Sequence, residues 1–263
     1  MIKRHSFQIK KRGKVISKVF SYLDEYSGKE TKEELVNKII EKIPFIMEIG
    51  FAGWKSKSAL KRNLLWNIYL GKKNKNIADY NEVKRAVIAC SSFIDKRVVF
   101  IFIFPTFDRF VLSKMKGVSG FHPWKNTISL FVNPNSYKKA IREIIVHEMA
   151  HVIGDYYSYN KIMDAIIFEG IAEHFREYLI GGRKSPWVTN ISKKKALDIL
   201  KNIGPNLNKK NDSLYRELFF GTGKYPMWAG YAIGYYVVQD YLNKHKDINW
   251  KAILKLDSDK IIK

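Results

Sequence analysis

Residues 147–151 contain two histidines whose spacing suits the binding of a metal ion. The run His147-Glu148-Met149-Ala150-His151 places the imidazoles at positions i and i+4, and on a helix such side chains are neighbours on one face. Zinc takes imidazole nitrogens at about 2.0–2.1 Å in a tetrahedral arrangement, and a catalytic zinc keeps one of its four positions for water. Glu148 projects beside the metal rather than onto it. It can therefore accept the proton of a zinc-bound water, whose pKa is lowered to about 7.

A catalytic zinc site needs a third protein ligand, and several residues compete for that role. A histidine at position 157 would complete the metzincin pattern, into which Gly154 fits, but the residue there is Tyr157. Asp155 or Asp164 could supply a carboxylate, although Asp155 lies at the end of the helix and Asp164 has no recognisable motif around it.

The remaining candidate for the third ligand is Glu169, in the segment Phe168-Glu169-Gly170-Ile171-Ala172-Glu173. It follows His151 after 17 residues, which is enough for the chain to turn and send back an antiparallel helix, and this spacing suits a gluzincin. Gly170 and Ala172 are small and allow close helix packing, while Glu173 stands one turn after Glu169 on the same face. We assign Glu169 to the metal. We expect Glu173 to accept the free N–H of a ligand histidine and so to fix its tautomer.

These two segments resemble the gluzincin branch of zinc peptidases, and the E-G-x-A-E form is similar to the YjaZ-like family of predicted zinc-dependent proteases. The run from Gly230 to Gln239 (Gly-Tyr-Ala-Ile-Gly-Tyr-Tyr-Val-Val-Gln) also resembles the closing helix of that family, so the resemblance covers residues 97–242. It implies a zincin-like core, one Zn²⁺ ion and a peptide or protein substrate.

The resemblance also implies a donor for the oxyanion that develops during amide hydrolysis, because related gluzincins use a Tyr or His from outside the metal helices. Tyr231 and Tyr235 are the candidates, and we favour Tyr231. The spacing of Gly230 and Gly234 would let their helix pack tightly and bring a tyrosine over the metal. His122 is a weaker candidate, and His174 is interpreted as a neighbour of Glu173 without a role of its own.

The periodicity of apolar residues predicts the elements that must position this site. Residues 98–104 are β-branched and aromatic, which predicts a buried central strand, whereas residues 127–133 alternate polar and apolar residues and predict a half-exposed strand. We expect the second strand to form the rim on which a peptide substrate adds as a further strand. Helices are predicted over residues 137–156 and 160–179, with Gly181-Gly182 ending the second one, and over residues 228–242.

The regions on either side of this core are predicted to be helical. Residues 1–95 read as an all-helical region, with helices over 32–47, 58–70 and 81–93; the first is opened by Thr31, and glycines and the tract 72–76 supply the turns. The expected class is therefore α+β. The expected organisation is a helical region over 1–95, a metal-binding core over 96–182 and a helical region over 183–263 that packs on the core.

The composition restricts the class of protein. The chain of 263 residues has 46% hydrophobic residues, which argues against wholesale disorder. The single cysteine, Cys90, excludes an intramolecular disulfide and is expected to be buried. The longest apolar run has seven residues, too few for a transmembrane helix, and the N-terminus has no apolar core of a secretory signal, so a cytoplasmic location is expected.

The formal net charge of +22, from 47 Lys and Arg against 25 Asp and Glu, would favour polyanionic partners. The basic residues are spread along the chain, which fits a solvated lysine-rich surface. We therefore predict a zinc metallopeptidase, with a basic protein that binds nucleic acid or another polyanion through a zincin-like fold as the alternative.

Overall fold

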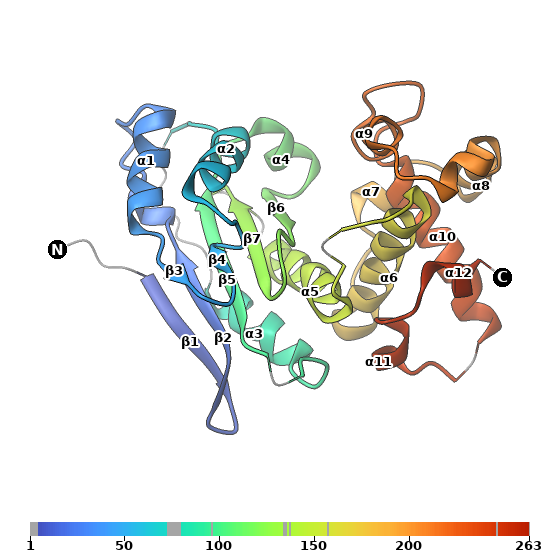
Figure 1. The fold of residues 1–263 in the computed structure, drawn as a ribbon, viewed down its shortest axis with the longest axis horizontal. Coiled ribbons are helices and arrows are strands. Elements are labelled where there is room, and N and C mark those ends of the chain that lie inside the picture. The colour runs from blue at the N-terminus through green and yellow to red at the C-terminus, as the bar shows by residue number, and fades with distance from the viewer. Residues whose placement is uncertain are drawn as a thin grey trace. The chain divides into compact units, whose positions relative to one another are not determined.

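The structure is a computed structural model, and it describes residues 5–72, 80–95, 97–133, 136, 138–156, 158–245 and 247–262. The fold is α+β, as predicted, with a five-stranded mixed sheet and many helices (Figure 1). The chain divides into two compact units, residues 1–152 and residues 153–263, and the three-part division predicted from the sequence stays a prediction. Some residues named in the sequence predictions lie outside the described residues: 73–76 of the predicted turn, Tyr137 at the predicted helix start, and Tyr157.

The mixed sheet belongs to the first unit and has the strand order β1-β2-β5-β7-β6. Strands β2, β5 and β7 are parallel, while β1 and β6 run antiparallel to their neighbours at the two edges. The central strand β5 is buried along its whole length, which confirms the strand predicted over residues 98–104. The bounds are β1 (His5–Lys11), β2 (Lys14–Ser21), β5 (Val99–Pro105), β6 (Val118–Phe121) and β7 (Thr127–Val132).

The prediction that residues 1–95 are all helical is wrong for residues 5–21, which form the hairpin of β1 and β2. Arg12 and Gly13 both have positive φ angles, 47° and 78°, as a two-residue turn of type I′ requires. The alternation is easy to miss in the sequence, because Ser17 and Ser21 occupy buried positions and lysines interrupt the apolar ones. The helix predicted over 32–47 also ends early, since Pro44 disfavours helical geometry at the residue before it.

The prediction that residues 127–133 form a half-exposed rim strand is wrong as well. Every residue of β7 is buried, because β7 lies between β5 and β6. Both faces and both edges of the strand are therefore covered. The edge of the sheet on this side is β6, so any peptide that adds to the sheet here would pair with β6.

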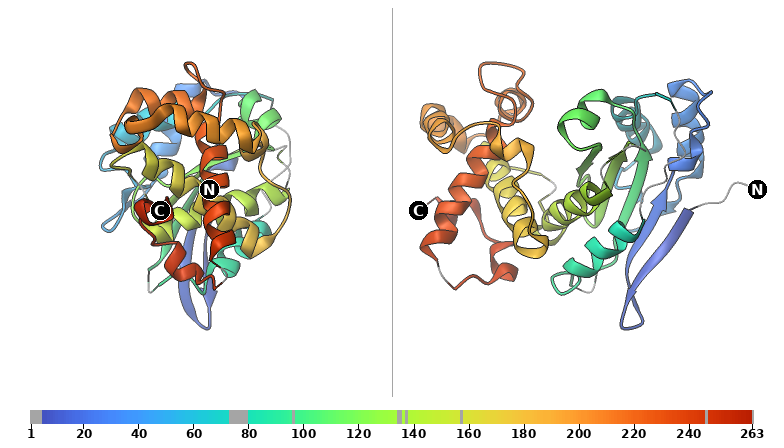
Figure 2. Two further views of the ribbon diagram at one scale, coloured as in Figure 1. Left: turned by 90° about the vertical axis from the view of Figure 1, so that its right-hand side faces the viewer. Right: turned by 180° about the vertical axis from the view of Figure 1, so that it is seen from behind.

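Helices of the first unit cover the sheet. Phe100, Phe102 and Phe104 of β5 point to one face, where they join the apolar residues of α1 and α2 in one buried cluster. The helix α1 is opened by Thr31, as predicted, and begins with a capping box in which Thr31 Oγ1 accepts a hydrogen bond from Glu34 N and the Glu34 carboxylate accepts one from Thr31 N. The helices α3 and α5 lie toward the opposite face (Figures 1 and 2). The remaining bounds are η1 (Leu23–Glu25), α1 (Lys32–Lys42), β3 (Phe45–Ile46), β4 (Gly50–Phe51), α2 (Lys57–Asn67), α3 (Tyr80–Cys90), α4 (Arg109–Lys114) and α5 (Lys138–Gly154).

The second unit is built around two long helices, α6 (Ile162–Ile180) and α10 (Ala229–Lys244). They approach so closely that a Cβ added to Gly234 would overlap the carbonyl oxygen of Ile166, and one added to Gly170 would overlap the carbonyl of Gly234. Gly181, with φ 62°, ends α6 as predicted. The shorter elements, several of which the sequence did not predict, are α7 (Pro186–Thr189), α8 (Lys193–Ile203), η2 (Gly204–Asn208), α9 (Asp212–Phe220), α11 (Trp250–Ile253) and α12 (Ser258–Ile261).

Two further features of the described residues bear on the sequence predictions. Cys90 is buried, as expected, and burial raises the pKa of its thiol. No helix among the described residues has the length and apolar character needed to span a bilayer.

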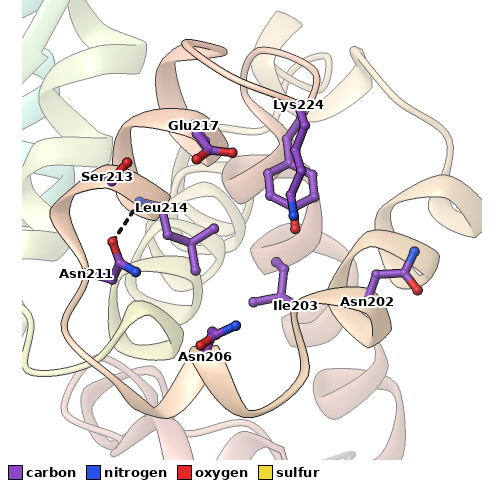
Figure 3. Close-up of a pocket in the computed structure, with 9 residues that line it drawn as sticks. Asn202, Ile203, Asn206, Asn211, Ser213, Leu214, Glu217 and Lys224 are labelled. Carbon is purple, nitrogen blue, oxygen red and sulfur yellow. Dashed lines mark hydrogen bonds between the residues drawn. The ribbon is translucent and has the colours of Figure 1, made fainter.

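A hollow of about 190 Å³ opens in the second unit between η2 and α9 (Figure 3). Its lining is mostly polar and exposed, and Asn211 at its border accepts a hydrogen bond from Leu214 N that caps α9. This hollow carries no cluster of buried charged groups.

The contact between α6 and α10 predicts that Gly234→Ala destabilises the protein by about 3 kcal/mol, because the added methyl group meets main-chain atoms that cannot rotate away. The free energy of unfolding in urea measures this change. Asn243→Ala, at an exposed position of the same helix, is the matched control and should be neutral or slightly stabilising. Equal stability of the two variants would contradict the close approach.

Candidate metal centre

The helix α5 brings two imidazoles together in the interior. His147 and His151 are both buried, and their Nε2 atoms lie 3.3 Å apart. Two nitrogens that each lie about 2.0–2.1 Å from one tetrahedrally coordinated ion are separated by about 3.3–3.4 Å. The spacing of the pair therefore fits two ligands of a single zinc ion.

A carboxylate completes the group. Ligand atoms of His147, His151 and Glu169 lie within 4.8 Å of one another, and no other group of three or more such side chains among the described residues could hold a metal ion. Two imidazoles and a carboxylate form a donor set that zinc favours in catalytic sites. The residues that the sequence assigned to the metal are thus the ones that the structure brings together.

Glu148 is also buried, and it lies on the side of α5 that faces the edge strand β6. A Cβ added to Gly120 of β6 would lie 3.0 Å from Cγ of Glu148 and 2.5 Å from Cγ2 of Ile144. The absence of a side chain at residue 120 therefore leaves the room that Glu148 occupies beside the strand.

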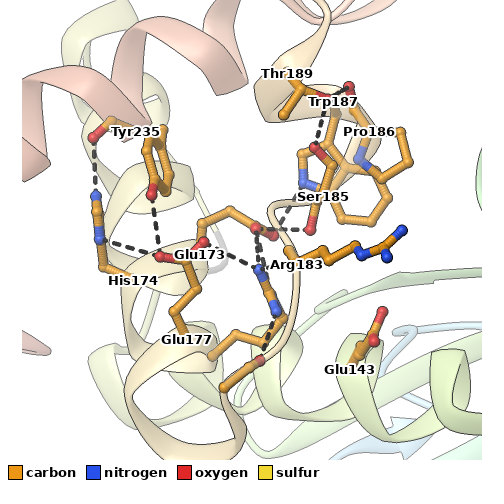
Figure 4. Close-up of polar contacts among 12 residues, drawn as sticks. Glu143, Glu173, His174, Glu177, Arg183, Ser185, Pro186, Trp187, Thr189 and Tyr235 are labelled. Atoms are coloured by element: carbon orange, nitrogen blue, oxygen red, sulfur yellow. Dashed lines mark hydrogen bonds and ion pairs between the residues drawn. The ribbon is translucent and has the colours of Figure 1, made fainter.

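Glu173 lies fully buried on α6, where several donors hold its carboxylate (Figure 4). Oε2 accepts hydrogen bonds from Ser185 Oγ at 2.7 Å and from Arg176 Nη2 at 3.2 Å, and Oε1 accepts one from Trp187 Nε1 at 3.0 Å. A buried carboxylate is costly unless it is paired and hydrogen-bonded in this way. The expected hydrogen bond between Glu173 and a ligand histidine stays a prediction.

Arg176, Ser185 and Trp187 were not singled out in the sequence. Arg176 is almost fully buried and also donates to the carbonyl oxygens of Gly181 and Arg183, so it ties α6 to the segment that follows it. Arg176 stands three residues after Glu173 in an apolar helix, and this spacing could have predicted an ion pair between the two. Ser185 precedes the four-residue helix α7 and Trp187 lies within it, and no periodic pattern marks either residue.

A second polar group lies one turn further along α6 (Figure 4). The Tyr235 hydroxyl donates a hydrogen bond to Glu177 Oε2 at 3.0 Å, and His174 Nε2 lies 2.9 Å from the carbonyl oxygen of Tyr235. Burial raises the pKa of Glu177 and of Tyr235 and lowers the pKa of His174. Tyr235, one of the two proposed oxyanion donors, is therefore buried with its hydroxyl already engaged.

Other candidates have contacts of an ordinary structural kind. Asp164 accepts hydrogen bonds from the main-chain N–H groups of Asn160 and Lys161 at the start of α6, and from Ser258 Oγ. Neither it nor Asp155 belongs to the metal group. His122 Nδ1 lies 2.8 Å from the carbonyl oxygen of Thr127.

Comparison with known proteins places the chain in a family. Residues 80–263 match the model of the family described as "Predicted Zn-dependent protease (DUF2268)". The chain belongs to this family. The match confirms the resemblance that the two motifs indicated, and the description supports zinc as the metal.

Two relatives in Bacillus subtilis (strain 168) carry the names of uncharacterized proteins. YjfC is 32% identical over 168 residues, which are 57% of this chain and 56% of the relative. YjaZ is 28% identical over 131 residues, which are 47% of this chain and 50% of the relative. The chain thus spans about half the length of the relatives that it matches. No solved structure matches the chain significantly.

The burial of Glu173 predicts that Arg176→Met destabilises the protein by about 3–5 kcal/mol, because the carboxylate then loses its charged partner in the interior. Chemical denaturation measures the change in the free energy of unfolding. Arg183→Met, at an exposed position nearby in sequence, is the control and should change stability by less than about 0.5 kcal/mol. A loss no greater than that of the control would show that the ion pair contributes little.

Proposed function

We propose that this protein is a zinc-dependent metallopeptidase of the gluzincin type, in which His147, His151 and Glu169 hold one zinc ion. The observation that carries the proposal is the proximity of their ligand atoms, within 4.8 Å of one another. The 3.3 Å separation of the imidazole nitrogens and the family description support it.

Zinc bound by these residues supplies a Lewis acid that polarises the scissile carbonyl and makes water acidic enough to attack near neutral pH. Glu148 is the general base that takes the proton from the attacking water. It can then pass that proton to the leaving amine, so the same carboxyl group serves both halves of the reaction. Its burial keeps bulk water from competing for the proton.

The substrate is a peptide segment in extended conformation, bound as an additional strand along β6. The outer edge of β6 ends the sheet order, and its Gly120 lies against Glu148. Main-chain hydrogen bonds to an edge strand hold a peptide with little dependence on its sequence. A peptide on β6 would therefore pass beside the proposed base.

Tyr231 is the proposed donor to the oxyanion. Its half-buried ring packs against Trp187 and Phe219, with ring centroids 6.3 and 5.1 Å away. Tyr235 is less suitable, since its hydroxyl donates to Glu177. A phenolic O–H in this role would stabilise the negative charge as it develops on the carbonyl oxygen.

Glu148→Gln is expected to lower the rate of peptide hydrolysis about 10²–10⁴-fold, because an amide cannot accept the proton from water. Zinc content should stay at one ion per chain, since residue 148 is not a ligand. Cleavage of quenched fluorescent peptides and elemental analysis of the purified variant measure the two quantities. Glu143→Gln is the matched control on the same helix, where the side chain pairs with Lys116 at 2.7 Å, and should retain activity.

Glu169→Ala separates the metal site from the general base. It should lose most of the bound zinc together with activity, because two imidazoles alone do not complete the ligand set. Full zinc occupancy in this variant would show that Glu169 is not a zinc ligand. Unchanged hydrolysis by Glu148→Gln would instead contradict the role of Glu148 as general base, without contradicting the proposed zinc ligands.

A further inference from the structure

The positive charge of the chain is unevenly distributed between its two units, and the proposed peptidase chemistry does not use it. Residues 1–152 contain 29 of the 47 Lys and Arg but only 13 of the 25 Asp and Glu. Residues 153–263 contain 18 basic residues against 12 acidic ones. The excess therefore lies mainly in the unit that contains the sheet.

Two segments of that unit are almost free of acidic residues. Residues 49–72 contain five Lys or Arg and no Asp or Glu, and residues 97–125 contain five Lys or Arg and only Asp108. The Asp108 carboxylate accepts a hydrogen bond from Phe110 N and so caps α4. These segments include α2 and α4, which Figure 1 and the rear view of Figure 2 both draw side by side.

Hydrogen bonds join the chain that leaves α2 to the chain that enters α4. Thr106 Oγ1 donates to the carbonyl oxygen of Asn67 at 2.9 Å, and Phe107 N donates to that of Tyr69 at 3.0 Å. These hydrogen bonds hold the residues at the end of α2 next to those that precede α4.

This surface exposes large apolar side chains. Trp66 is 79% exposed, and Tyr69, Leu70, Phe110 and Leu112 are between 37% and 47% exposed. Leu64 of α2 and Val111 of α4 point into the core. The five apolar side chains near them therefore remain exposed to solvent. Exposed apolar groups of this size in one area are uncommon unless something covers them. We call these five exposed residues, together with the exposed cations Arg62, Lys72, Arg109 and Lys114, the α2–α4 surface.

Four exposed basic residues accompany these apolar side chains. Arg62 lies one turn before Trp66, on the outward face of α2, since Leu60 and Leu64 mark its inward face. The four exposed basic residues are Arg62, Lys72, Arg109 and Lys114. Within the described part of the chain, no carboxylate forms an ion pair with any of them.

We infer that the α2–α4 surface binds the surface of an anionic lipid bilayer. Trp and Tyr favour the boundary between headgroups and acyl chains, because each joins an apolar ring to a polar group. Leucine and phenylalanine side chains gain by entering the acyl region, and each cation near anionic headgroups contributes about 1 kcal/mol. The α2–α4 surface carries both kinds of residue, as a peripheral membrane site requires.

Single-stranded nucleic acid is the other polyanion that aromatic and basic residues could bind. Such sites stack bases on aromatic rings, and Leu70 and Leu112 have no ring on which a base could stack. Aliphatic side chains contribute to binding only where a partner offers an apolar region to receive them. The mixture of aliphatic and aromatic residues therefore favours a lipid surface over nucleic acid.

The test is co-sedimentation of the full chain with phosphatidylcholine vesicles and with vesicles that also contain phosphatidylglycerol. We expect binding to the anionic vesicles, weakened by salt, and little binding to the neutral ones. Trp66→Ala should weaken binding about tenfold, whereas Trp66→Phe should retain most of it. Arg62→Glu should weaken binding to anionic vesicles at low salt only.

Phe220→Ala is the matched control, because Phe220 is an exposed aromatic residue of the second unit, and it should bind as the wild type does. An unchanged thermal melt of Trp66→Ala would show that the variant is folded. Absence of binding to anionic vesicles, or equal binding by Trp66→Ala and wild type, overturns the inference. Binding of single-stranded DNA that depends on Trp66, without vesicle binding, overturns it in favour of nucleic acid. None of these outcomes depends on peptidase activity.

Discussion

The geometry of the candidate metal centre depends on two imidazoles held one helical turn apart inside a helix that is buried on nearly all sides. The helix fixes the spacing of His147 and His151 along the chain, and burial restricts the rotation of their rings, so the two nitrogens stay 3.3 Å apart. Two buried nitrogens that face each other at this distance are suited to share a positive ion. Glu148, on the same helix, is carried to the side that faces β6 by the same periodicity.

Carboxylates in an apolar helix place a second constraint on the fold. Glu169 and Glu173 lie on α6, and the buried one can stay charged only because Arg176, Ser185 and Trp187 surround it with donors. The close approach of α6 and α10 at Gly170 and Gly234 holds the helix that carries both residues. The helix therefore combines tight apolar packing with a satisfied polar network.

The uneven charge gives the first unit a surface whose chemistry differs from that of the metal centre. Its cations accompany exposed apolar side chains on α2 and α4, whereas the proposed base and the two histidines of the proposed site are buried. If this surface rests on a bilayer, the protein would meet substrates that are themselves at or near a membrane. The surface that binds the membrane and the residues proposed for catalysis would then belong to different elements of one chain.

The sequence by itself determined the main helices and the proximity of His147 and His151, because residues at i and i+4 of a helix lie on one face whatever the surroundings. It also determined the α+β class and the buried strand β5, whose apolar run has no other stable placement. The tertiary structure alone decided that residues 5–21 pair as strands and that β6, not β7, forms the edge of the sheet. Strand order and the donors around Glu173 depend on segments distant in the chain, and no local period in the sequence encodes which of those segments will meet.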